Sequence, residues 1–392
     1  MPRFPHFSER VQGLGGSIFE RYEKSMRAQG DNLVRMHIGD TYRQPDYPLA
    51  LEEQFRQSHP NFNCYPNTFG TAALRRLLLE KINEDNFELE GIENIMVSSG
   101  GTHALSAAMM AILNPGDEVI IPTPAWPLYF GIVKLAGGAY TELPLFTKES
   151  ALNESDFSAA LESCVNDRTV AIYVNSPNNP SGRQLTQTQM QTIIKFAERH
   201  NLWIVADEAY DGLVYDGESS PSIASLPSAF ERTMTVFTFS KLYMFAGIRL
   251  GYLTGPAEVI RKANAALVHQ IYSAQMPGQL LLEDAVGLRH EWKPRVVEAF
   301  RQARDHFMLH CPVPITAPSG GYFAFFDIAD YLNGRDYWDV IEACIDGGIS
   351  PAAGINFGRD FGSWIRLCFT GEPHERLQLG LERFGRVLLN DA

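Results

Sequence analysis

The sequence lacks the features that mark several common classes of protein. None of its apolar runs approaches the roughly 18 residues that a membrane-spanning helix needs. Its five cysteines are scattered and form no CxxC pair, so neither a disulfide framework nor a zinc site is indicated. Basic residues are outnumbered by acidic ones, 33 to 46, and the net charge of −13 argues against a nucleic-acid partner. We therefore expect no metal site, no membrane contact and no nucleic-acid partner.

Two further absences concern location and cofactor. The first residues, MPRFPHFSERVQG, contain no apolar segment of the kind found in secretory signals, so a cytoplasmic protein is expected. No GxGxxG segment follows an early strand, which disfavours a dehydrogenase that binds a nicotinamide cofactor on such a loop.

What the sequence does contain is typical of a large globular α/β protein. Hydrophobic residues make up 45% of its 392 residues and charged residues 20%, and this length suits two domains of unequal size. Apolar runs rich in β-branched residues alternate with stretches of helical spacing such as 187–200. This alternation predicts a mostly parallel sheet with helices on both faces. The predicted strands are 118–122, 170–174, 202–206 and 234–238.

The last third has a different pattern and predicts a smaller α+β unit. A long helical stretch near 280–310 is followed by two apolar segments, 320–327 and 364–369, which are expected to form strands. The first forty or so residues are expected to pack on this unit. Ligands of open α/β sheets bind beyond the carboxyl ends of the strands. We therefore expect the ligand-binding and catalytic residues to lie directly after the strands of the larger unit.

The most informative segment follows the strand 234–238. Lys241 lies close to two hydroxyl residues, Thr238 and Ser240, and eight residues before Arg249. A lysine amine can form an imine with an aldehyde, while hydroxyls and a guanidinium group can hold a phosphate. Pyridoxal 5'-phosphate carries both groups, so the segment indicates a site for this cofactor with Lys241 as its reactive centre. Taken alone, the segment is also compatible with any anion site beside a strand.

Other strands are followed by segments with suitable ligand chemistry. Gly101 and Thr102 precede a helical run, where backbone N–H groups and the helix N-terminus attract an anion. Trp126 lies in a stiff, proline-rich loop and can lay its ring against a flat heterocycle. Asn179 lies in a dense turn segment and can hydrogen-bond a cofactor hydroxyl. Each segment is also compatible with a structural role, either as a turn or as a core-filling ring.

A carboxylate and a phenol follow the strongest strand, 202–206. Burying the carboxylate of Asp207 at the end of a strand costs free energy unless a cation lies beside it. A protonated pyridine nitrogen is such a cation. Tyr210 lies three residues further along and can donate to the oxygen on the same ring. The alternative for Asp207 is a structural salt bridge with an arginine or lysine. In their order along the chain, these strand-end residues point to one site.

Together the motifs resemble those of the class I and II aminotransferases, the fold-type I pyridoxal-phosphate enzymes. The resemblance extends from about Gly39 to Arg366, nearly the whole chain. The segment with Lys241, Gly247 and Arg249 matches the family signature in both spacing and residue type. The resemblance implies a transaminase that moves an amino group between an L-α-amino acid and a 2-keto acid on pyridoxal 5'-phosphate.

The resemblance also implies a role for each matching residue. Lys241 forms the imine and moves protons, while Asp207 pairs with the ring nitrogen. The α-carboxylate of the substrate is expected on Arg366, with Gly39 and Asn179 on the substrate side. The other expected cofactor ligands are Gly101, Thr102, Trp126, Asn179, Tyr210, Thr238, Ser240 and Arg249.

The same resemblance implies an architecture. It predicts a large α/β domain with a mostly parallel, seven-stranded sheet covered by helices, plus a smaller α+β domain, as in aspartate aminotransferase. We place the large domain at residues 46–290 and the small domain at 1–45 and 291–392. Tyr65 matches a tyrosine that in the family crosses to the neighbouring subunit's phosphate. A symmetric homodimer with shared active sites is therefore expected.

The segment around Gly39 is the least typical part of the chain. Many family members have Gly-x-Pro here, whereas this sequence continues with Asp40 and Thr41. His37 is compatible with a hydrogen-bonded structural residue. It is also compatible with a residue that, together with Glu20, meets a basic or polar substrate side chain. Some relatives that share this scaffold cyclise or oxidise arginine, and the stretch Ser17-Ile-Phe-Glu-Arg-Tyr22 resembles that subgroup.

Two alternative functions stay open at this stage. The first is another reaction on the same cofactor, namely elimination, cyclisation or oxidation of an amino acid, which begins with the same carbanion. The second is a sensor that joins an aminotransferase-like domain to a DNA-binding module. The sensor is disfavoured because only about forty residues precede Gly39 and the chain is acidic.

Overall fold

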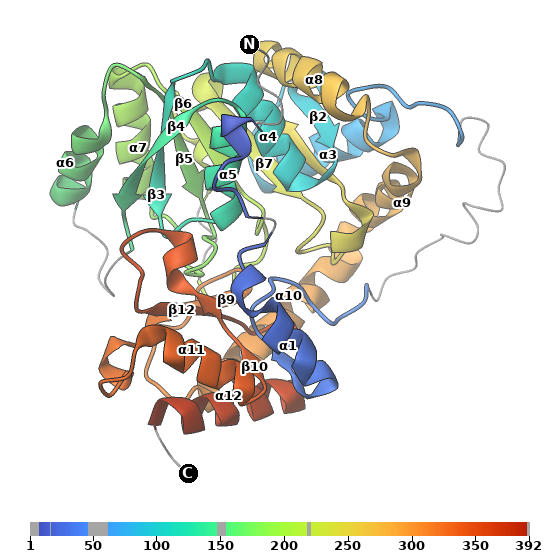
Figure 1. The fold of residues 1–392 in the computed structure, drawn as a ribbon. Coiled ribbons are helices and arrows are strands. Elements are labelled where there is room, and N and C mark those ends of the chain that lie inside the picture. Colours follow the sequence, from blue (N-terminus) through green and yellow to red (C-terminus); the bar gives the residue numbers. More distant parts are fainter. Residues whose placement is uncertain (1–7, 16, 46–61, 147–153, 218–220, 390–392) are drawn as a thin grey trace, which may run out of the picture.

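The computed structural model has a large unit built on a seven-stranded sheet and a smaller unit below it in Figure 1. It describes residues 8–15, 17–45, 62–146, 154–217 and 221–389. The strands of the large sheet are β2 (Ile95–Ser98), β3 (Glu118–Thr123), β4 (Ala139–Pro144), β5 (Thr169–Asn175), β6 (Trp203–Asp207), β7 (Thr233–Thr238) and β8 (Gly251–Thr254). Their spatial order is β2-β8-β7-β6-β5-β3-β4. All neighbouring pairs are parallel except the two that β8 makes, which are antiparallel.

The central strands are buried, in agreement with their apolar, β-branched sequences. In β6, for example, Ile204, Val205 and Ala206 all belong to the core. Continuous apolar runs of this kind are required where helices cover both faces of a parallel sheet. The four strands predicted from the sequence are confirmed as β3, β5, β6 and β7, with each end within one residue of its predicted position.

Helices cover both faces of the large sheet (Figure 1). One face packs against α4 (Gly100–Ile112), α5 (Pro127–Leu135) and α8 (Ala257–Ile271). The other face packs against α3 (Ala72–Asp85), α6 (Glu154–Cys164), α7 (Gln187–Arg199) and α9 (Met276–Gly287). Helix α7 confirms the predicted helix 187–200, and a capping box of Thr186 and Gln189 fixes where it begins.

The predicted helical stretch near 280–310 is two helices rather than one. Helix α9 ends at Gly287, and α10 (Arg289–His310) begins after a single intervening residue, Leu288. Glycine is a poor helix former, and here it lies at the last position of α9. Arg289 then donates to the carbonyl of Val286 and pairs with Glu84 of α3, which holds the start of α10 against the large unit.

The smaller unit contains an antiparallel sheet and a short parallel pair. In the sheet, β12 (Trp364–Cys368) lies between β11 (Ala352–Ala353) and β9 (Phe323–Asp327). In the pair, β1 (Val34–Arg35) joins β10 (Ile349–Ser350). Strands β9 and β12 confirm the two strands predicted in this region. The helices that pack here are α1 (Glu23–Gln29), α11 (Tyr337–Asp346) and α12 (His374–Leu389).

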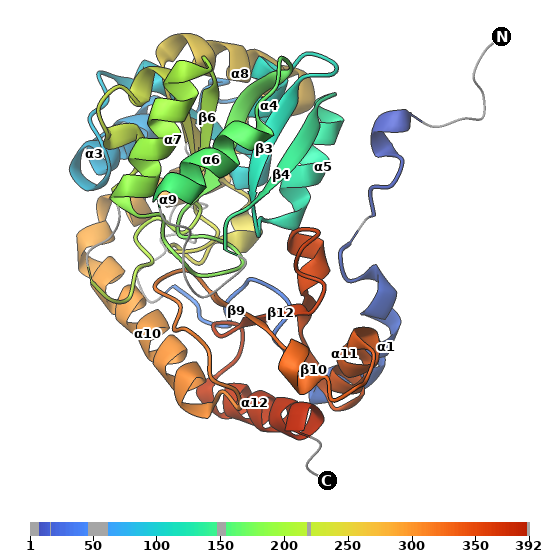
Figure 2. The ribbon, with the colours of Figure 1, turned by 90° about the vertical axis from the view of Figure 1, so that its left-hand side faces the viewer.

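The N-terminal segment contacts both units (Figure 2). Helix α1 packs on α11 and β1 joins β10, as expected for a segment that packs on the smaller unit. The short 3-10 helix η1 (Glu9–Val11), however, lies against α5 of the large unit. Because α10 begins at Arg289, the boundary expected at residue 290 falls in its first turn. The division into domains at residues 46 and 290 stays a prediction.

The parallel strands all point their carboxyl ends toward the smaller unit (Figure 1). Strands β5, β6 and β7 therefore end at the same edge of the sheet, which is where open α/β sheets bind their ligands. Within the described residues, no helix has the length and apolarity to cross a membrane. In the same part of the chain, no cluster of three or more His, Cys, Asp or Glu residues is arranged to bind a metal ion.

Candidate active site

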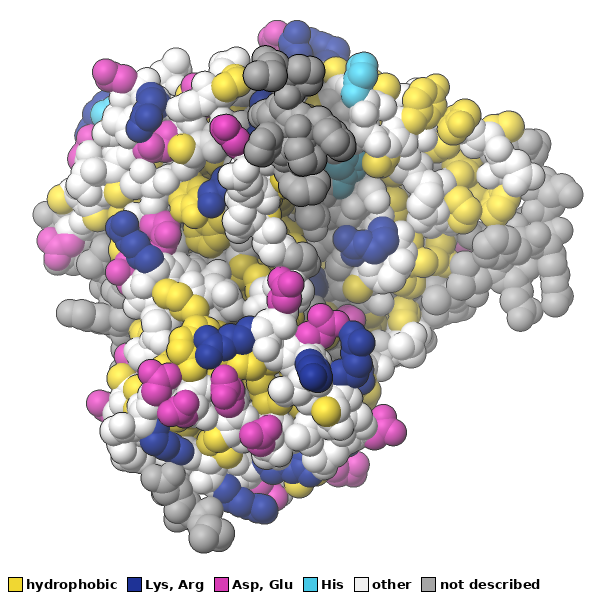
Figure 3. Space-filling view, in the orientation of Figure 1, with side chains coloured by type: hydrophobic (Ala, Val, Ile, Leu, Met, Phe, Trp, Pro, Cys, Tyr) yellow, Lys and Arg dark blue, Asp and Glu magenta, His cyan; other side chains and the backbone are white. Residues whose placement is uncertain are grey.

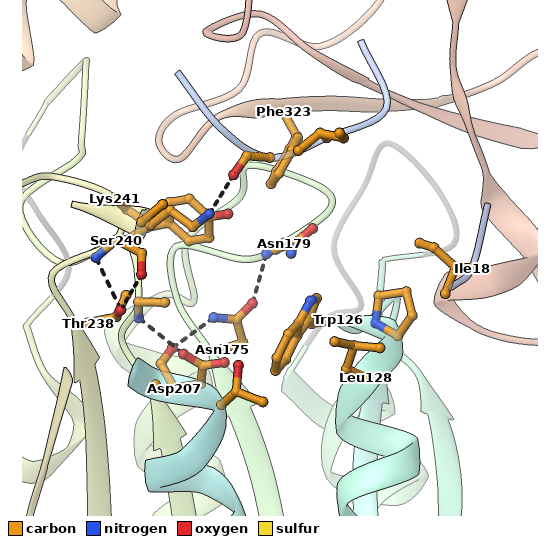
Figure 4. A pocket seen from close by; sticks show the side chains of 18 of the residues that line it. Ile18, Trp126, Leu128, Asn175, Asn179, Asp207, Thr238, Ser240, Lys241 and Phe323 are labelled. Carbon is orange, nitrogen blue, oxygen red and sulfur yellow. Dashed lines mark hydrogen bonds between the residues drawn. The ribbon is translucent and has the colours of Figure 1, made fainter. Parts of the chain in front are cut away.

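A cavity of about 400 Å³ lies at the carboxyl edge of the large sheet, next to the smaller unit (Figure 4). Its walls come from distant parts of the chain, including the N-terminal segment, the ends of β5 to β7 and strands β9 and β12. Every site residue predicted from the sequence lines this cavity except Tyr65. The lining residues predicted in advance are Gly39, Gly101, Thr102, Trp126, Asn179, Asp207, Tyr210, Thr238, Ser240, Lys241, Arg249 and Arg366.

Lys241 follows β7 and extends its side chain into the cavity. Its amine donates a hydrogen bond to the carbonyl of Gly39, and the backbone carbonyl of Lys241 accepts from the Tyr322 hydroxyl at 2.8 Å. Burial lowers the pKa of Lys241 to about 8, against an opposing effect from Asp40. The neutral amine, which a nucleophile or a base requires, is therefore far more populated near pH 7 than in an ordinary lysine.

Asp207 lies at the end of β6, on the floor of the cavity, and is only 5% exposed. It accepts hydrogen bonds from the Tyr173 hydroxyl at 2.7 Å and from the Ala209 N–H at 3.1 Å. Among the described residues, no arginine or lysine forms an ion pair with it. Burial raises the pKa of Asp207 to about 6, so the site favours a cation beside this carboxylate. The structural salt bridge considered from the sequence is not found among those residues.

The start of α4 lies beside a cluster of hydroxyls and a guanidinium group. No side chain caps this helix terminus at Ser99, which leaves first-turn N–H groups available for an anion. The hydroxyls of Thr238 and Ser240 are 3.0 Å apart. One guanidinium nitrogen of Arg249 lies 3.5 Å from the Ser240 hydroxyl. These groups share one corner of the cavity and have the chemistry of a phosphate site.

Glycines allow the chain segments around this corner of the cavity to pack closely together. Gly100 has a φ of +81°, and a Cβ added there would lie 2.8 Å from a guanidinium nitrogen of Arg249. A Cβ on Gly251 would lie 2.8 Å from the backbone nitrogen of Gly101. Arg249 itself adopts a left-handed backbone with a φ of 54°, and its side chain is held at 2.7 Å by the Ala246 carbonyl. Side chains at these glycines would fill the space that the anion site needs.

Arg366, from β12, is buried and aimed at the cavity. It donates to the Asn179 side-chain oxygen at 2.9 Å and to the His37 carbonyl. Its guanidinium carbon lies 4.0 Å from the centre of the Phe323 ring. The Nε–H has no hydrogen-bond partner among the described residues. Burial lowers the pKa of Arg366 to about 10, so it remains a cation at neutral pH.

A chain of amides connects Arg366 with Asp207. The Asn175 side chain donates to the backbone carbonyl of Asp207 at 2.7 Å and accepts from the backbone N–H of Asn179 at 2.7 Å. The Asn179 side chain in turn accepts from Arg366. The end of β5 is thus connected to β6 on one side and to β12 on the other, which holds the carboxylate and the guanidinium group at fixed positions.

Two aromatic residues complete the predicted set. Trp126 immediately precedes α5, and its ring lies between Asn175 and Leu128 in Figure 4. Tyr210 is buried and packs edge-on against Tyr322, with ring centres 5.5 Å apart. Burial raises the pKa of Tyr210, so its hydroxyl remains a hydrogen-bond donor at neutral pH.

Tyr65 lies outside the cavity. It is 82% exposed, and its ring centre lies 4.8 Å from that of Tyr272. Its contact with a neighbouring subunit stays a prediction.

His37 lines the cavity, whereas Glu20 does not. The ring Nδ1 of His37 lies 2.5 Å from the Ser350 hydroxyl, and its ring packs edge-on against Phe19 at 4.6 Å. Burial lowers the pKa of His37 to about 4, with a further contribution from Arg366. The imidazole is therefore neutral at pH 7. This arrangement agrees with the structural interpretation, and Glu20 has an exposed side chain.

Several lining residues escaped the sequence interpretation. Asn175 carried a usable signal, because it is a polar residue at the end of a predicted strand. Phe323 was assigned only to a strand. Apolar residues such as Ile18 and Leu128 gave no signal, because an apolar side chain in a cavity wall has the same sequence pattern as one in the core. The lining residues that sequence reasoning did not select as ligands include Ser17, Ile18, Phe19, Ile38, Leu128, Asn175 and Phe323.

Comparisons with known proteins agree with this site. The family model for aminotransferase class I and II matches residues 38–384. An aspartate aminotransferase of Musicola paradisiaca is 32% identical over 93% of this chain and 92% of its own length. An arginine–pyruvate transaminase of Pseudomonas aeruginosa is 28% identical over 93% of each chain. The structure of an aspartate aminotransferase from Thermus thermophilus with maleate superimposes with a TM-score of 0.86 at 29% identity, covering 98% of this chain and 100% of that one.

The chain therefore belongs to the class I and II aminotransferases. It has the aspartate aminotransferase-like fold, which confirms the fold predicted from the sequence. It is a pyridoxal-phosphate-dependent transaminase that moves an amino group between an L-α-amino acid and a 2-keto acid. The comparisons lend no support to elimination, cyclisation or oxidation as its reaction.

Proposed function

We propose that this chain is a cytoplasmic, homodimeric aminotransferase of amino-acid biosynthesis or metabolism, in which Lys241, Asp207 and Arg366 carry the transfer. One observation supports this assignment above the others: an amine, a buried carboxylate and a buried guanidinium group line the same cavity. Each has a perturbed pKa or an unused hydrogen-bonding atom. Groups of this kind concentrate at functional sites.

The donor set fits pyridoxal 5'-phosphate. The first turn of α4, with Thr238, Ser240 and Arg249, would hold the phosphate. Asp207 would meet the pyridine nitrogen, because its burial without a cation makes a protonated nitrogen favourable there. Trp126 would cover one face of the ring, and Asn179 and Tyr210 would reach the ring oxygen. When bound, the cofactor supplies an aldehyde for the imine and a protonated ring that accepts electrons from the α-carbon.

The protein's own groups would bind the substrate and move its protons. Arg366 would hold the α-carboxylate, because its Nε–H lacks a partner among the described residues and its planar fork suits a carboxylate. Lys241 would take the α-proton on Nζ and return it, since its lowered pKa makes the neutral amine accessible. Asp207 would keep the proton on the ring nitrogen throughout. Asn179 would hold Arg366 in place.

A homodimer is supported by an exposed apolar surface as well as by the family resemblance. Hydrophobic side chains gather over α8 and α9 on the right of Figure 3. Tyr65, Ile271 and Tyr272 are all exposed, and so is Met110 on α4. Contiguous exposed apolar side chains mark interaction sites. A second copy seated here would cover them and would bring its Tyr65 to the neighbouring cavity.

Absorbance spectroscopy tests the assignment. The purified protein with pyridoxal 5'-phosphate is expected to be yellow and to convert an amino acid only when a 2-keto acid acceptor is supplied. Lys241→Ala should abolish the imine absorbance and reduce turnover by more than about 1,000-fold, because both the nucleophile and the base are lost. The matched control is Lys195→Ala, which removes an exposed lysine on α7.

Two outcomes would contradict the proposal. Product formation or ammonia release without an acceptor would indicate the elimination or oxidation alternative. Full imine absorbance in Lys241→Ala, with an unchanged unfolding temperature, would show that another amine is the reactive one.

A further inference from the structure

We propose that the amino-acid substrates of this chain carry an uncharged, largely apolar side chain. The proposal rests on the proposed function and extends it, because it concerns the part of the cavity that lies beyond Lys241 and Arg366. Substrate names do not decide the question. The relatives compared above are named for aspartate and for arginine, two amino acids of opposite side-chain charge, at similar levels of identity.

The cavity has few charged side chains, and each is already assigned to a group of the cofactor or to the substrate α-carboxylate. Among the described residues that line it, the charged side chains are Asp207, Lys241, Arg249 and Arg366. The proposed function assigns these to the ring nitrogen, the imine, the phosphate and the α-carboxylate. Within the described residues of one subunit, no lining cation is left for a side-chain carboxylate, and no lining carboxylate is left for an ammonium or guanidinium group. Tyr65, which the proposed dimer brings to the cavity from the second subunit, adds no charge.

His37 does not supply the missing charge. Its imidazole is neutral at pH 7, because burial lowers its pKa to about 4, and its Nδ1 is engaged with Ser350. The positive charges of Arg366 and Arg35 further disfavour its protonation. Ser17, which also lines the cavity, offers only a neutral hydroxyl.

The remaining wall is apolar. Ile18 lies above Leu128 in Figure 4, both on the same side of the Trp126 ring, and Phe19 and Ile38 line the same cavity. Leu128 is 46% exposed and Ile38 is 45% exposed, so both keep apolar surface that a ligand can cover. Covering such surface favours an aliphatic or aromatic side chain, whereas a charged group placed there would lose water without gaining a partner.

Further charges lie in two adjoining grooves. One shares Ile38 with the cavity and holds both signs, with Arg376 paired to Glu372 at 2.9 Å and the Asp40 carboxylate accepting from the Thr41 N–H. The charges of the other groove, which shares Ile18 and Leu128 with the cavity, are three. They are Lys134, Glu142 and Arg359, a mixture of both signs. The Arg359 side chain is 68% exposed and lies 3.8 Å from Asp360, and the Lys134 amine lies over the Tyr140 ring. An exposed cation beside its own carboxylate is a weak ligand for a substrate carboxylate. The charges of these grooves are therefore poor ligands for a charged substrate side chain in the cavity.

The first experiment is a single-turnover measurement with the loaded enzyme. Leucine, methionine and phenylalanine are compared with aspartate, glutamate, lysine and arginine, and the loss of cofactor aldehyde absorbance is followed. This half-reaction needs no acceptor, so it reports the donor alone. The uncharged group is expected to react at least about tenfold faster at low concentration, the ratio that corresponds to one missing charged hydrogen bond. Calorimetry provides a second readout, in which 3-phenylpropanoate should bind more tightly than maleate.

The second experiment adds the charge that the cavity lacks. Leu128→Lys places an amine on the apolar wall, and the ratio of aspartate to leucine reactivity is expected to rise at least about tenfold. The matched control, Leu128→Gln, gives a polar side chain without charge and should leave that ratio within about threefold of the wild type.

The outcomes separate the two proposals. Aspartate, glutamate, lysine or arginine as the best donor would overturn the inference and leave the aminotransferase assignment intact. If the best donor were acidic and Arg359→Ala removed that preference, the cation would be located in the adjoining groove. If no amino acid changed the absorbance, the proposed function would fail, and this inference with it.

Discussion

Individual buried residues show how burial tunes the chemistry of the cavity. Burial lowers the pKa of Lys241 to about 8 and raises that of Asp207 to about 6. Both shifts bring a group that normally titrates far from neutrality close to pH 7. For Lys241, the shift makes a neutral amine accessible. For Asp207, the raised pKa reflects the free energy needed to bury a carboxylate without a cation beside it. A protonated ring nitrogen would supply that cation.

His37 offers a test of burial that does not depend on catalysis. Its pKa is about 4 in the folded chain and 6.5 as the reference value, so the unfolded chain takes up this proton first as the pH falls. The free energy of unfolding should therefore decrease from pH 6.5 down to about 4, and this contribution should be constant below that. The full effect is about 3 kcal/mol. Urea unfolding of the wild type and of His37→Gln, across this window, measures it.

His37→Gln is a suitable reference because glutamine can still bond Ser350 and does not titrate. The wild type should lose stability relative to the variant on acidification. A difference between the two proteins that stays constant with pH would contradict the assigned pKa.

At the scale of secondary structure, an ionic network fastens α3 to the loop that follows β6. Lys81 of α3 is almost fully buried, pairs with Asp211, and donates to Asn86 at 2.7 Å. Asn86 in turn donates to Asp211 at 2.9 Å. Burial alone would lower the pKa of Lys81, but Asp211 outweighs it and the pKa is raised. The network holds the loop that carries Tyr210.

Removing only one charged partner of this network should lower the free energy of unfolding. Lys81→Met is expected to lower the free energy of unfolding by about 3–5 kcal/mol, because it leaves Asp211 as a poorly solvated, unpaired charge. The double variant Lys81→Met/Asp211→Leu should recover most of that loss, since it removes both charges. Urea titrations of the wild type and both variants give the comparison. A loss below about 1 kcal/mol in the single variant would show that water reaches Asp211 more freely than the structure indicates.

At the scale of the whole molecule, the cavity lies between two units and beside an exposed apolar surface. The smaller unit contributes Phe323 and Arg366, while the large unit contributes Lys241 and Asp207. Tyr65 lies on the outside, next to Tyr272. Because Tyr65 lies outside the cavity of its own subunit, we expect it to contact the cofactor phosphate of the neighbouring subunit in a dimer.

Mixed dimers test whether Tyr65 acts across the interface. Lys241→Ala and Tyr65→Phe are each expected to be impaired as homodimers, the second by about tenfold through the loss of a phosphate contact. If Tyr65 serves the neighbour, a mixed dimer contains one cavity with both native residues. Refolding the two variants together should therefore restore activity well above that of either one alone. Tyr65 acting on its own subunit would give no such recovery.

Much of the fold follows from local patterns. The strands 118–122 and 170–174 were predictable because buried parallel strands need continuous apolar runs, and the pattern needs no tertiary information. The stretch near 280–310 is helical as predicted, but its break at Leu288 was not predicted. The local signal for the break is a single glycine at the end of α9, and the pairing of Arg289 with Glu84 of a distant helix then holds the start of α10. Contacts with distant partners leave little trace in local periodicity.

For the candidate site, residue types and their order along the chain are enough to predict which chemistry is present. Lys241, Asp207 and Arg249 could be selected because burying reactive and charged groups at strand ends costs free energy unless they bind a ligand. How these groups are arranged follows from the folding of the whole chain. Folding brings Arg366 next to Asn179, leaves Glu20 outside the cavity that His37 lines, and places Ile18 above Leu128 in Figure 4. The physical reason is that residue type fixes a group's reactivity, whereas its neighbours, and thus the substrate it admits, depend on chain folding over hundreds of residues.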